Sequence, residues 1–239
     1  MHSNSTQNTM LLSRGVRCLP QPPGNPAQQT SGRTLDHVAR IYDWIEPWMM
    51  MGMDRVIRRE TLDLIRLKGI ERVLDVGCGT GTLTREIAGF LCVSQLACVV
   101  GVDAATAMID VARRKAAQLP NVAFEAALAE QLPFADESFD CAVSTMFFHH
   151  INASLKLRAL NEIWRTLAPR GKLVVVDVTR PTNWFGSLCA WAGYVLFQQA
   201  EIRENIEGKL EEAFEQSEFR QWRRVAHHAG YISVYELEK

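Results

Sequence analysis

Three glycines that follow an apolar run are the most chemically informative feature of the sequence. Residues 73–81 read Val-Leu-Asp-Val-Gly-Cys-Gly-Thr-Gly, so that Gly77, Gly79 and Gly81 are separated by single residues. The pattern predicts a buried strand, a tight turn and a helix that begins at Thr82. Because glycine has no Cβ, a ligand can approach the backbone N–H groups at the amino end of that helix. The chemistry expected here is the binding of a nucleotide-like ligand.

Two acidic residues stand at the ends of predicted strands. Asp103 follows the apolar run 96–102, where a carboxylate can accept hydrogen bonds from both hydroxyls of a ribose. The alternative role for Asp103 is to cap the helix that follows it, and ribose binding is the preferred interpretation. Asp75 interrupts an apolar strand, where an acid costs free energy unless it has a partner.

The glycine spacing distinguishes among nucleotide-binding families. The dinucleotide fingerprint GxGxxG requires glycine at position 82, which is threonine, and no GxxxxGK[ST] phosphate loop is present. The string DVGCGTG at residues 75–81 instead resembles the first motif of class I S-adenosylmethionine-dependent methyltransferases. The resemblance implies S-adenosylmethionine as cofactor, S-adenosylhomocysteine as product, and Asp75 near the amino group of the methionine moiety.

Later stretches strengthen this resemblance. Residues 129–140 (AEQLPFADESFD) are similar to a family motif in which the acid that contacts the adenine amine aligns with Leu128 of this chain. The adenine would then be held by backbone groups and apolar packing around residues 127–130. Residues 162–173 (EIWRTLAPRGKL) resemble the family pattern ExxRxLxPGGxL, with Arg170 in place of its first glycine. The segment HVARIYDWIEP and the later pair of histidines look most like the ubiquinone/menaquinone biosynthesis (UbiE-like) branch.

The resemblance implies a set of cofactor-binding residues, in which the aromatic ring of Tyr42 closes over the cofactor. The set comprises Tyr42, Asp75, Gly77, Cys78, Gly79, Gly81, Asp103, Ala104, Met108, Ala129, Glu130 and Ser144.

His149 and His150 are the candidate catalytic residues. They follow the predicted fourth strand, at the carboxyl edge where α/β sheets bind ligands. Histidine titrates near neutral pH, so either ring could take a proton from an acceptor. The alternative is that one or both hydrogen-bond to a loop as structural residues. His227 and His228 are predicted to lie on the surface of a late helix.

The acceptor expected from the sequence is small and lipophilic. The position after the fourth strand reads STMF rather than the [DN]PP[FYW] of nucleic-acid amino methyltransferases, and no basic patch is visible. The Met/Trp cluster at residues 44–53 and the uncharged stretch 184–197 favour a quinone-like aromatic or a lipid amine. Two alternatives remain open: a transferase of another group from S-adenosylmethionine, and a catalytically silent cofactor-binding subunit.

The elements that must position these residues alternate regularly. Strands at 72–76, 96–102, 122–125, 139–144 and 172–178 are separated by predicted helices. This predicts an α/β, Rossmann-like, doubly wound and mostly parallel sheet with helices on both faces. Within one methyltransferase domain over residues 34–239, we expect cap helices at 34–70, a cofactor-binding core at 71–180, and a helical lid with one final strand at 181–239. In that last part, residues 218–228 are predicted to form a helix and residues 231–237 a strand.

Composition sets the remaining bounds. The 239 residues include 26 Lys and Arg against 27 Asp and Glu, a net charge of −1 that argues against binding to nucleic acid. Residues 1–33, rich in Ser, Asn, Gln, Pro and Gly, predict a disordered tail, with a transit peptide as the alternative.

None of the six cysteines forms a CxxC pair, so no metal site is expected, and reduced thiols favour the cytoplasm. The stretch 184–197 is too short to span a bilayer and is compatible with a buried helix, a lid or peripheral membrane contact. The oligomeric state is left open.

Overall fold

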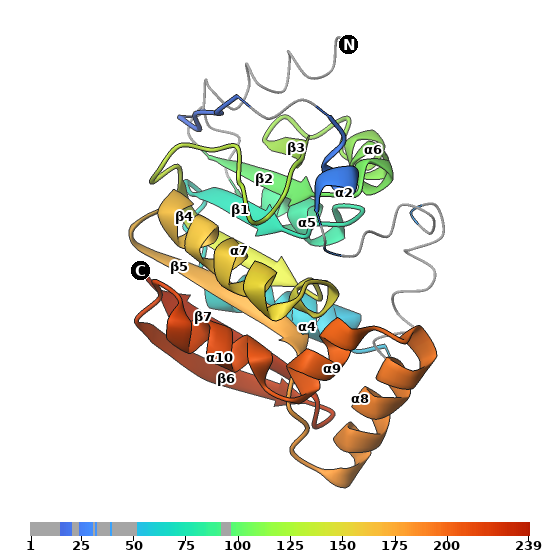
Figure 1. Ribbon diagram of the computed structural model, residues 1–239. Helices are drawn as coiled ribbons and strands as arrows, with labels where there is room; N and C mark the ends of the chain where they lie inside the picture. The colour runs from blue at the N-terminus through green and yellow to red at the C-terminus, as the bar shows by residue number, and fades with distance from the viewer. Residues whose placement is uncertain (1–14, 21–23, 31, 33–38, 40–51, 92–96) are drawn as a thin grey trace.

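The computed structural model describes residues 15–20, 24–30, 32, 39, 52–91 and 97–239. Its centre is one sheet of seven strands (Figure 1). The strands are β1 (Arg72–Val76), β2 (Cys98–Asp103), β3 (Val122–Ala126), β4 (Phe139–Thr145), β5 (Leu167–Val178), β6 (Gln221–His228) and β7 (Ile232–Glu238). They lie in the order β3-β2-β1-β4-β5-β7-β6, and β7 runs antiparallel to both of its neighbours, β5 and β6. The predicted Rossmann-like, mostly parallel sheet is confirmed.

Helices cover both faces of this sheet. They are α2 (Pro26–Gln29), α4 (Asp54–Ile65), α5 (Thr82–Phe90), α6 (Thr106–Lys115), the 3-10 helix η2 (Phe148–His150), α7 (Ala153–Thr166), α8 (Trp184–Phe197), α9 (Ala200–Ile206) and α10 (Lys209–Gln216). Alternate residues of a strand point into two separate apolar clusters on opposite faces of the sheet. Leu74 belongs to the cluster that includes residues of α7 and α10, and Val73 belongs to the cluster that includes residues of α4, α5 and α6. Because the strands are buried on both sides, they consist of nearly continuous apolar residues.

The carboxyl-terminal part corrects the prediction of a single last strand. The predicted helix at 218–228 is wrong, because Gln221–His228 pairs with β7 as an antiparallel strand. Ala229 and Gly230 both have positive φ, +48° and +78°, the geometry of a tight hairpin turn. His227 and His228 therefore lie on a strand. Their partners are Ser233 and Thr182 for His227, and Glu60 of α4 for His228.

The charge-rich residues 201–215 contribute to two helices rather than one. Gly208, at φ +94°, separates α9 from α10. Helix α8 has the predicted extent of 184–197 and projects beyond the sheet beside α9 (Figure 1). Within the described residues, every helix falls short of the length and apolar character needed to cross a membrane.

Part of the segment expected to be a disordered tail packs on the core. Val16 is fully buried in one of the two apolar clusters. The backbone of Arg17 and Leu19 exchanges hydrogen bonds with Ala135 and Pro133. The expectation of disorder is therefore wrong for residues 15–20, because apolar contact and backbone pairing offset the entropy lost on ordering.

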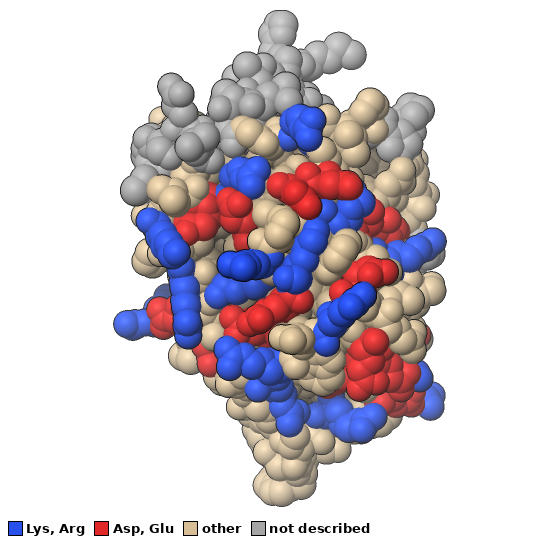
Figure 2. Space-filling model, turned by 90° about the vertical axis from the view of Figure 1, so that its left-hand side faces the viewer, with Lys and Arg blue, Asp and Glu red and all other residues tan. Residues whose placement is uncertain are grey.

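The amino edge of the sheet carries charges of both signs. Figure 2 faces this edge and shows Lys and Arg interleaved with Asp and Glu. One of the ion pairs joins Arg72 to Asp140 at 2.8 Å, where β1 and β4 begin. On the face that Figure 2 shows, the charges of opposite sign largely neutralise each other.

Candidate functional site

The glycine turn joins β1 to α5 in a backbone conformation that requires glycine. Gly77, Gly79 and Gly81 have φ of +75°, +52° and +76°. A Cβ on Gly77 would lie 2.5 Å from the side chain of Phe147. The N–H groups of Gly77 and Cys78 donate to the carbonyl of Val102, at 2.9 and 3.0 Å. The turn is thereby fixed against the carboxyl end of β2.

Asp103 ties that turn to the next helix. One carboxylate oxygen accepts from the backbone N–H of Gly79 at 3.0 Å, and the other accepts from Ala105 at 2.8 Å, just before α6. Asp103 is not the N-cap of α6, which is Ala105, but its carboxylate fixes the turn before that helix and also lines the cleft. A carboxylate has about four lone-pair sites, so two ribose hydroxyls can bind to it as well.

Asp75 is an acid buried at the end of β1. It is 1% exposed, and one oxygen accepts a hydrogen bond of 2.6 Å from the hydroxyl of Thr84. Burial raises the pKa of Asp75, the hydrogen bond from Thr84 opposes the rise, and the charge of Asp103 adds to it, so that the pKa is about 7. Ionising Asp75 without a partner therefore costs free energy, and a cationic ammonium group bound in the cleft would reduce that cost.

This perturbed acid predicts a pH-dependent affinity for the cofactor. A bound ammonium lowers the pKa of Asp75, so binding releases a proton wherever the unliganded acid is protonated. We expect the affinity for S-adenosylhomocysteine to rise as the pH increases from about 5.5 to about 7, by up to tenfold per unit, and to level off above. Titration calorimetry across this range measures it.

The matched variant for this prediction is Asp75→Asn. The amide can still accept from Thr84, so the fold is expected to persist while the affinity falls and its pH dependence flattens. An asparagine variant with the same slope as the native protein contradicts the assignment of the slope to Asp75.

A cleft of about 1130 Å³, partly open to solvent, runs along the carboxyl edge of the sheet. This volume includes the open solvent at the mouth of the cleft. The predicted residues that line it are Asp75, Gly77, Cys78, Gly79, Asp103, Ala104, Met108, Ala129, Glu130 and His150. The acids and the positive-φ glycines fit the cationic methionine end and the ribose of S-adenosylmethionine.

Three predicted site residues lie elsewhere, and a fourth lies outside the described residues. Ser144 is fully buried and donates to the carbonyl of Val76 at 2.9 Å, whereas its neighbour Thr145 lines the cleft, because successive strand residues face opposite ways. Gly81 packs beneath Phe124, where a Cβ would lie 2.6 Å from the ring. His149 also points away from the cleft. Tyr42 lies outside the described residues.

The two histidines have different surroundings. His149 is 5% exposed, and its Nδ1 lies 2.7 Å from a carboxylate oxygen of Asp177, which is fully buried. His150 lines the cleft, and its Nδ1 lies 3.2 Å from the side-chain oxygen of Gln199. Of the two candidate bases, His150 is therefore the one that can meet a ligand.

Sequence reasoning missed several residues of the cleft wall. Phe147 lies beside the glycine turn, and Asp54 and Arg58 of α4 form an ion pair of 3.0 Å that also faces the cleft. Spacing of an acid and a base by four residues was the available signal for this pair. Thr30, from the supposed tail, donates to the carboxylate of Glu130 at 3.0 Å and lines the cleft too. No local pattern marks such a contact across 100 residues.

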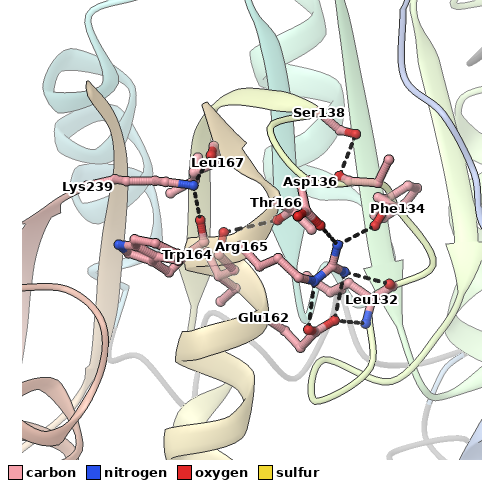
Figure 3. Close-up of polar contacts among 12 residues, drawn as sticks. Leu132, Phe134, Asp136, Ser138, Glu162, Trp164, Arg165, Thr166, Leu167 and Lys239 are labelled. Atoms are coloured by element: carbon pink, nitrogen blue, oxygen red, sulfur yellow. Dashed lines mark hydrogen bonds and ion pairs between the residues drawn. The ribbon is translucent and has the colours of Figure 1, made fainter. Parts of the chain in front are cut away.

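The motif at residues 162–173 positions the loop formed by the motif at residues 129–140, which carries Ala129 and Glu130. In Figure 3, Arg165 of α7 reaches into this loop and donates to the carbonyls of Leu132 and Phe134, at 3.2 and 2.8 Å. Glu162 accepts from Leu132 N–H at 2.9 Å and pairs with Arg165. The hydrogen bonds that Arg165 donates to the carboxylate of Glu162 raise the pKa of the Arg165 guanidinium. The ExxR pattern thus holds the wall of the cleft in place.

The backbone of Arg170 adopts a left-handed conformation, at the position where the family motif has glycine. Its φ is +64°, so the chain accepts the strain of a left-handed non-glycine residue at this turn.

Known proteins similar to this chain agree with the geometry. Residues 73–171 match a family described as a methyltransferase domain. The demethylmenaquinone methyltransferase of Beutenbergia cavernae is 39% identical over 62% of this chain and 57% of its own length. The ubiquinone/menaquinone biosynthesis C-methyltransferase UbiE of Hahella chejuensis is 34% identical over 68% of this chain and 65% of its own length. The matches thus span less than two thirds of these relatives.

A solved structure of similar fold is a SAM-dependent methyltransferase from Aquifex aeolicus. It superposes with a TM-score of 0.54 at 20% identity, covering 76% of this chain and 88% of that one. At this identity the likeness concerns the fold. Residues 73–171 thus correspond to a methyltransferase domain, and the Rossmann-like fold of the chain is that of S-adenosylmethionine-dependent methyltransferases of known structure.

Proposed function

We propose that the protein transfers the methyl group of S-adenosylmethionine to a ring carbon of a lipophilic hydroquinone. The observation that carries this proposal is a single cleft with two kinds of wall. The glycine turn, Asp75 and Asp103 line it together with apolar side chains and His150. The names of the relatives, which specify menaquinone and ubiquinone biosynthesis, support the class of acceptor.

The residues of this chain divide the work of binding. Asp75 holds the methionine amino group, and Asp103 holds the ribose. The backbone of residues 127–130 borders the adenine, in agreement with the absence of an acid at Leu128. When bound, S-adenosylmethionine supplies a methyl group on a positively charged sulfur, which leaves as neutral S-adenosylhomocysteine.

The apolar wall orients the acceptor. Ile57, Met146, Phe147 and Ile151 border this part of the cleft, where a bound acceptor would be shielded from water by their apolar side chains. His150 accepts the proton of the acceptor's hydroxyl, which raises electron density at the adjacent ring carbon. That carbon takes the methyl group as the bond from methyl to sulfur breaks. Its own hydrogen then leaves to solvent as a proton, and the hydroxyl regains its proton from His150. Alignment of two bound reactants alone is worth on the order of 7–11 kcal/mol in well-oriented intramolecular reactions.

Helix α8 provides a route for a lipophilic acceptor as part of this proposal. Its exposed side chains include Trp184, Leu188, Val195 and Leu196, the last of these 75% exposed. No charged residue occurs among its 14 residues, a composition that favours peripheral contact with membrane lipid. Sedimentation with phospholipid vesicles tests it, and a protein that stays in the supernatant at every lipid concentration contradicts the contact.

The assay for the central proposal uses methyl-labelled S-adenosylmethionine and a short-chain demethylmenaquinone reduced to its hydroquinone. Label is expected in the organic phase, in a product heavier by one methyl group in place of hydrogen. The oxidised quinone and phosphatidylethanolamine serve as comparison acceptors. His150→Ala is expected to lower the rate by about 100-fold or more while S-adenosylhomocysteine still binds.

Three outcomes overturn the proposal in different ways. Label found only in phosphatidylethanolamine would mean that the acceptor is a lipid amine rather than a hydroquinone. A product mass that shows transfer of a group other than methyl would mean that the protein is a transferase of another kind. Binding of S-adenosylhomocysteine without transfer to any acceptor indicates a silent cofactor-binding subunit.

A further inference from the structure

His149 and His150 have different polar partners, which give the two residues different roles. Asp177, at the end of β5, accepts hydrogen bonds from the backbone N–H groups of Phe148 and Val178, each at 2.7 Å. The same carboxylate lies 2.7 Å from Nδ1 of His149. His149 and Asp177 therefore fix the turn η2 from its buried side.

His150, the next residue, is held from another element. Gln199, the residue before α9, is 4% exposed and lies outside the set that lines the cleft. Its side-chain oxygen lies 3.2 Å from Nδ1 of His150. With the amide oxygen turned toward the ring, Nδ1 carries the hydrogen, because an amide oxygen only accepts. In the neutral ring the lone pair is then on Nε2.

The backbone around Gln199 is itself fixed. Gln198 ends α8 at φ +49°, and its N–H donates to the carbonyl of Tyr194 at 2.7 Å. Asn205 of α9 donates to the carbonyl of Val178 at 3.0 Å. The junction of α8 and α9 is thereby anchored to the sheet, which gives the Gln199 side chain a defined place beside η2.

We propose that Gln199 is a positioning residue that selects the Nδ1–H tautomer of His150 and so presents Nε2 as the proton acceptor in the cleft. The inference rests on the proposed function for its consequence in catalysis, but its structural content is independent of any acceptor. It links the apolar helix α8 to the chemistry, because the residue that sets the tautomer lies where α8 passes into α9.

Other ionisable groups surround this pair. The ring of His149 lies 4.0 Å from that of His150, centroid to centroid. Asp177 lies behind His149, and Lys156 of α7 forms an ion pair of 3.1 Å with Glu204 of α9. Further along the cleft, α4 contributes the Asp54–Arg58 pair, and the loop after β3 contributes Glu130. Among these groups Gln199 is uncharged, and its oxygen accepts from Nδ1–H of the neutral ring as well as of the protonated ring.

Histidine nitrogen NMR on the full chain tests the assignment directly. The His150 signals are identified by their loss in His150→Asn. We expect a predominant Nδ1–H tautomer at high pH in the native protein and a mixture of tautomers in Gln199→Leu. Gln199→Glu adds a carboxylate beside Nδ1 and is expected to raise the pKa of His150 by on the order of one unit. The matched control is Gln198→Glu, the same change at an exposed neighbour, expected to shift it much less.

Kinetics with the reduced demethylmenaquinone probe provide the second readout. We expect Gln199→Leu to lower kcat about tenfold with S-adenosylhomocysteine affinity unchanged, and Gln199→Glu to move the acidic limb of the kcat profile upward with the pKa of His150. An Nε2–H tautomer in the native protein, or an unchanged tautomer in Gln199→Leu, overturns the inference. Absence of transfer to the probe, with the expected tautomers observed, overturns the proposed function alone.

Discussion

Asp103→Ala is expected to weaken the binding of S-adenosylhomocysteine by roughly 100-fold or more. Two hydrogen bonds from ribose hydroxyls to a carboxylate are worth about 1.5–3 kcal/mol each. The substitution also removes the acceptor for Gly79 N–H and for Ala105 N–H, which loosens the glycine turn and the start of α6 together. Titration calorimetry at pH 7.5 measures the change.

Two further variants show whether the loss comes from the charge at that position. Asp103→Asn keeps the shape and one acceptor oxygen, so an intermediate affinity is expected. Asp63→Ala makes the same truncation at an exposed position of α4 outside the cleft and is expected to bind like the native protein. Native affinity in Asp103→Ala would remove this residue from the cofactor site.

Asp103 also illustrates what sequence reasoning can reach. The glycine turn and the two acids are specified by residues close together in the chain, and each has a chemical reason to stand where it does. Local pattern was therefore sufficient to predict the strand, the turn and the side of the sheet on which Asp75 and Asp103 meet. The second role of Asp103, as acceptor for Gly79, depends on the approach of β2 to β1 and had no local signal.

The last hairpin shows where such reasoning failed. Gln221–His228 contains Gln, Arg and Ala, which favour helices, and its strand conformation follows from pairing with β7. Trp222 on this strand packs against Phe214 of α10 and Tyr235 of β7, with ring centroids 5.6 and 5.8 Å apart. Contacts of this kind decide the conformation, and they join residues from three elements.

The histidine pair shows an intermediate case. Position after the fourth strand was enough to place both rings at the correct edge of the sheet. Which of them faces the cleft depends on Asp177 and Gln199, which lie 28 and 49 residues further along the chain. Ser144 was misassigned for a related reason, because a shift of one residue along a strand reverses the direction of its side chain.

Gly77→Ala is expected to destabilise the protein and abolish cofactor binding. At φ +75° an alanine is strained by about 1–2 kcal/mol, and its Cβ would lie 2.5 Å from the ring base of Phe147. Phe147 cannot easily retreat, because the N–H of Phe148 is bound to buried Asp177. With overpacking at about 1–3 kcal/mol, the melting temperature should fall by roughly 5–15 °C.

A control and a rescue separate the clash from the backbone strain. Gly89→Ala lies in α5 with nothing within 4 Å of the added Cβ, so it is expected to stabilise by about 0.5–1 kcal/mol. In Gly77→Ala/Phe147→Ala the clash is removed and the strain at φ +75° remains. The double variant is therefore expected to be more stable than the two single effects predict by addition, since the residues are in contact. Strict additivity in thermal unfolding would show that Phe147 does not set the glycine requirement of the turn.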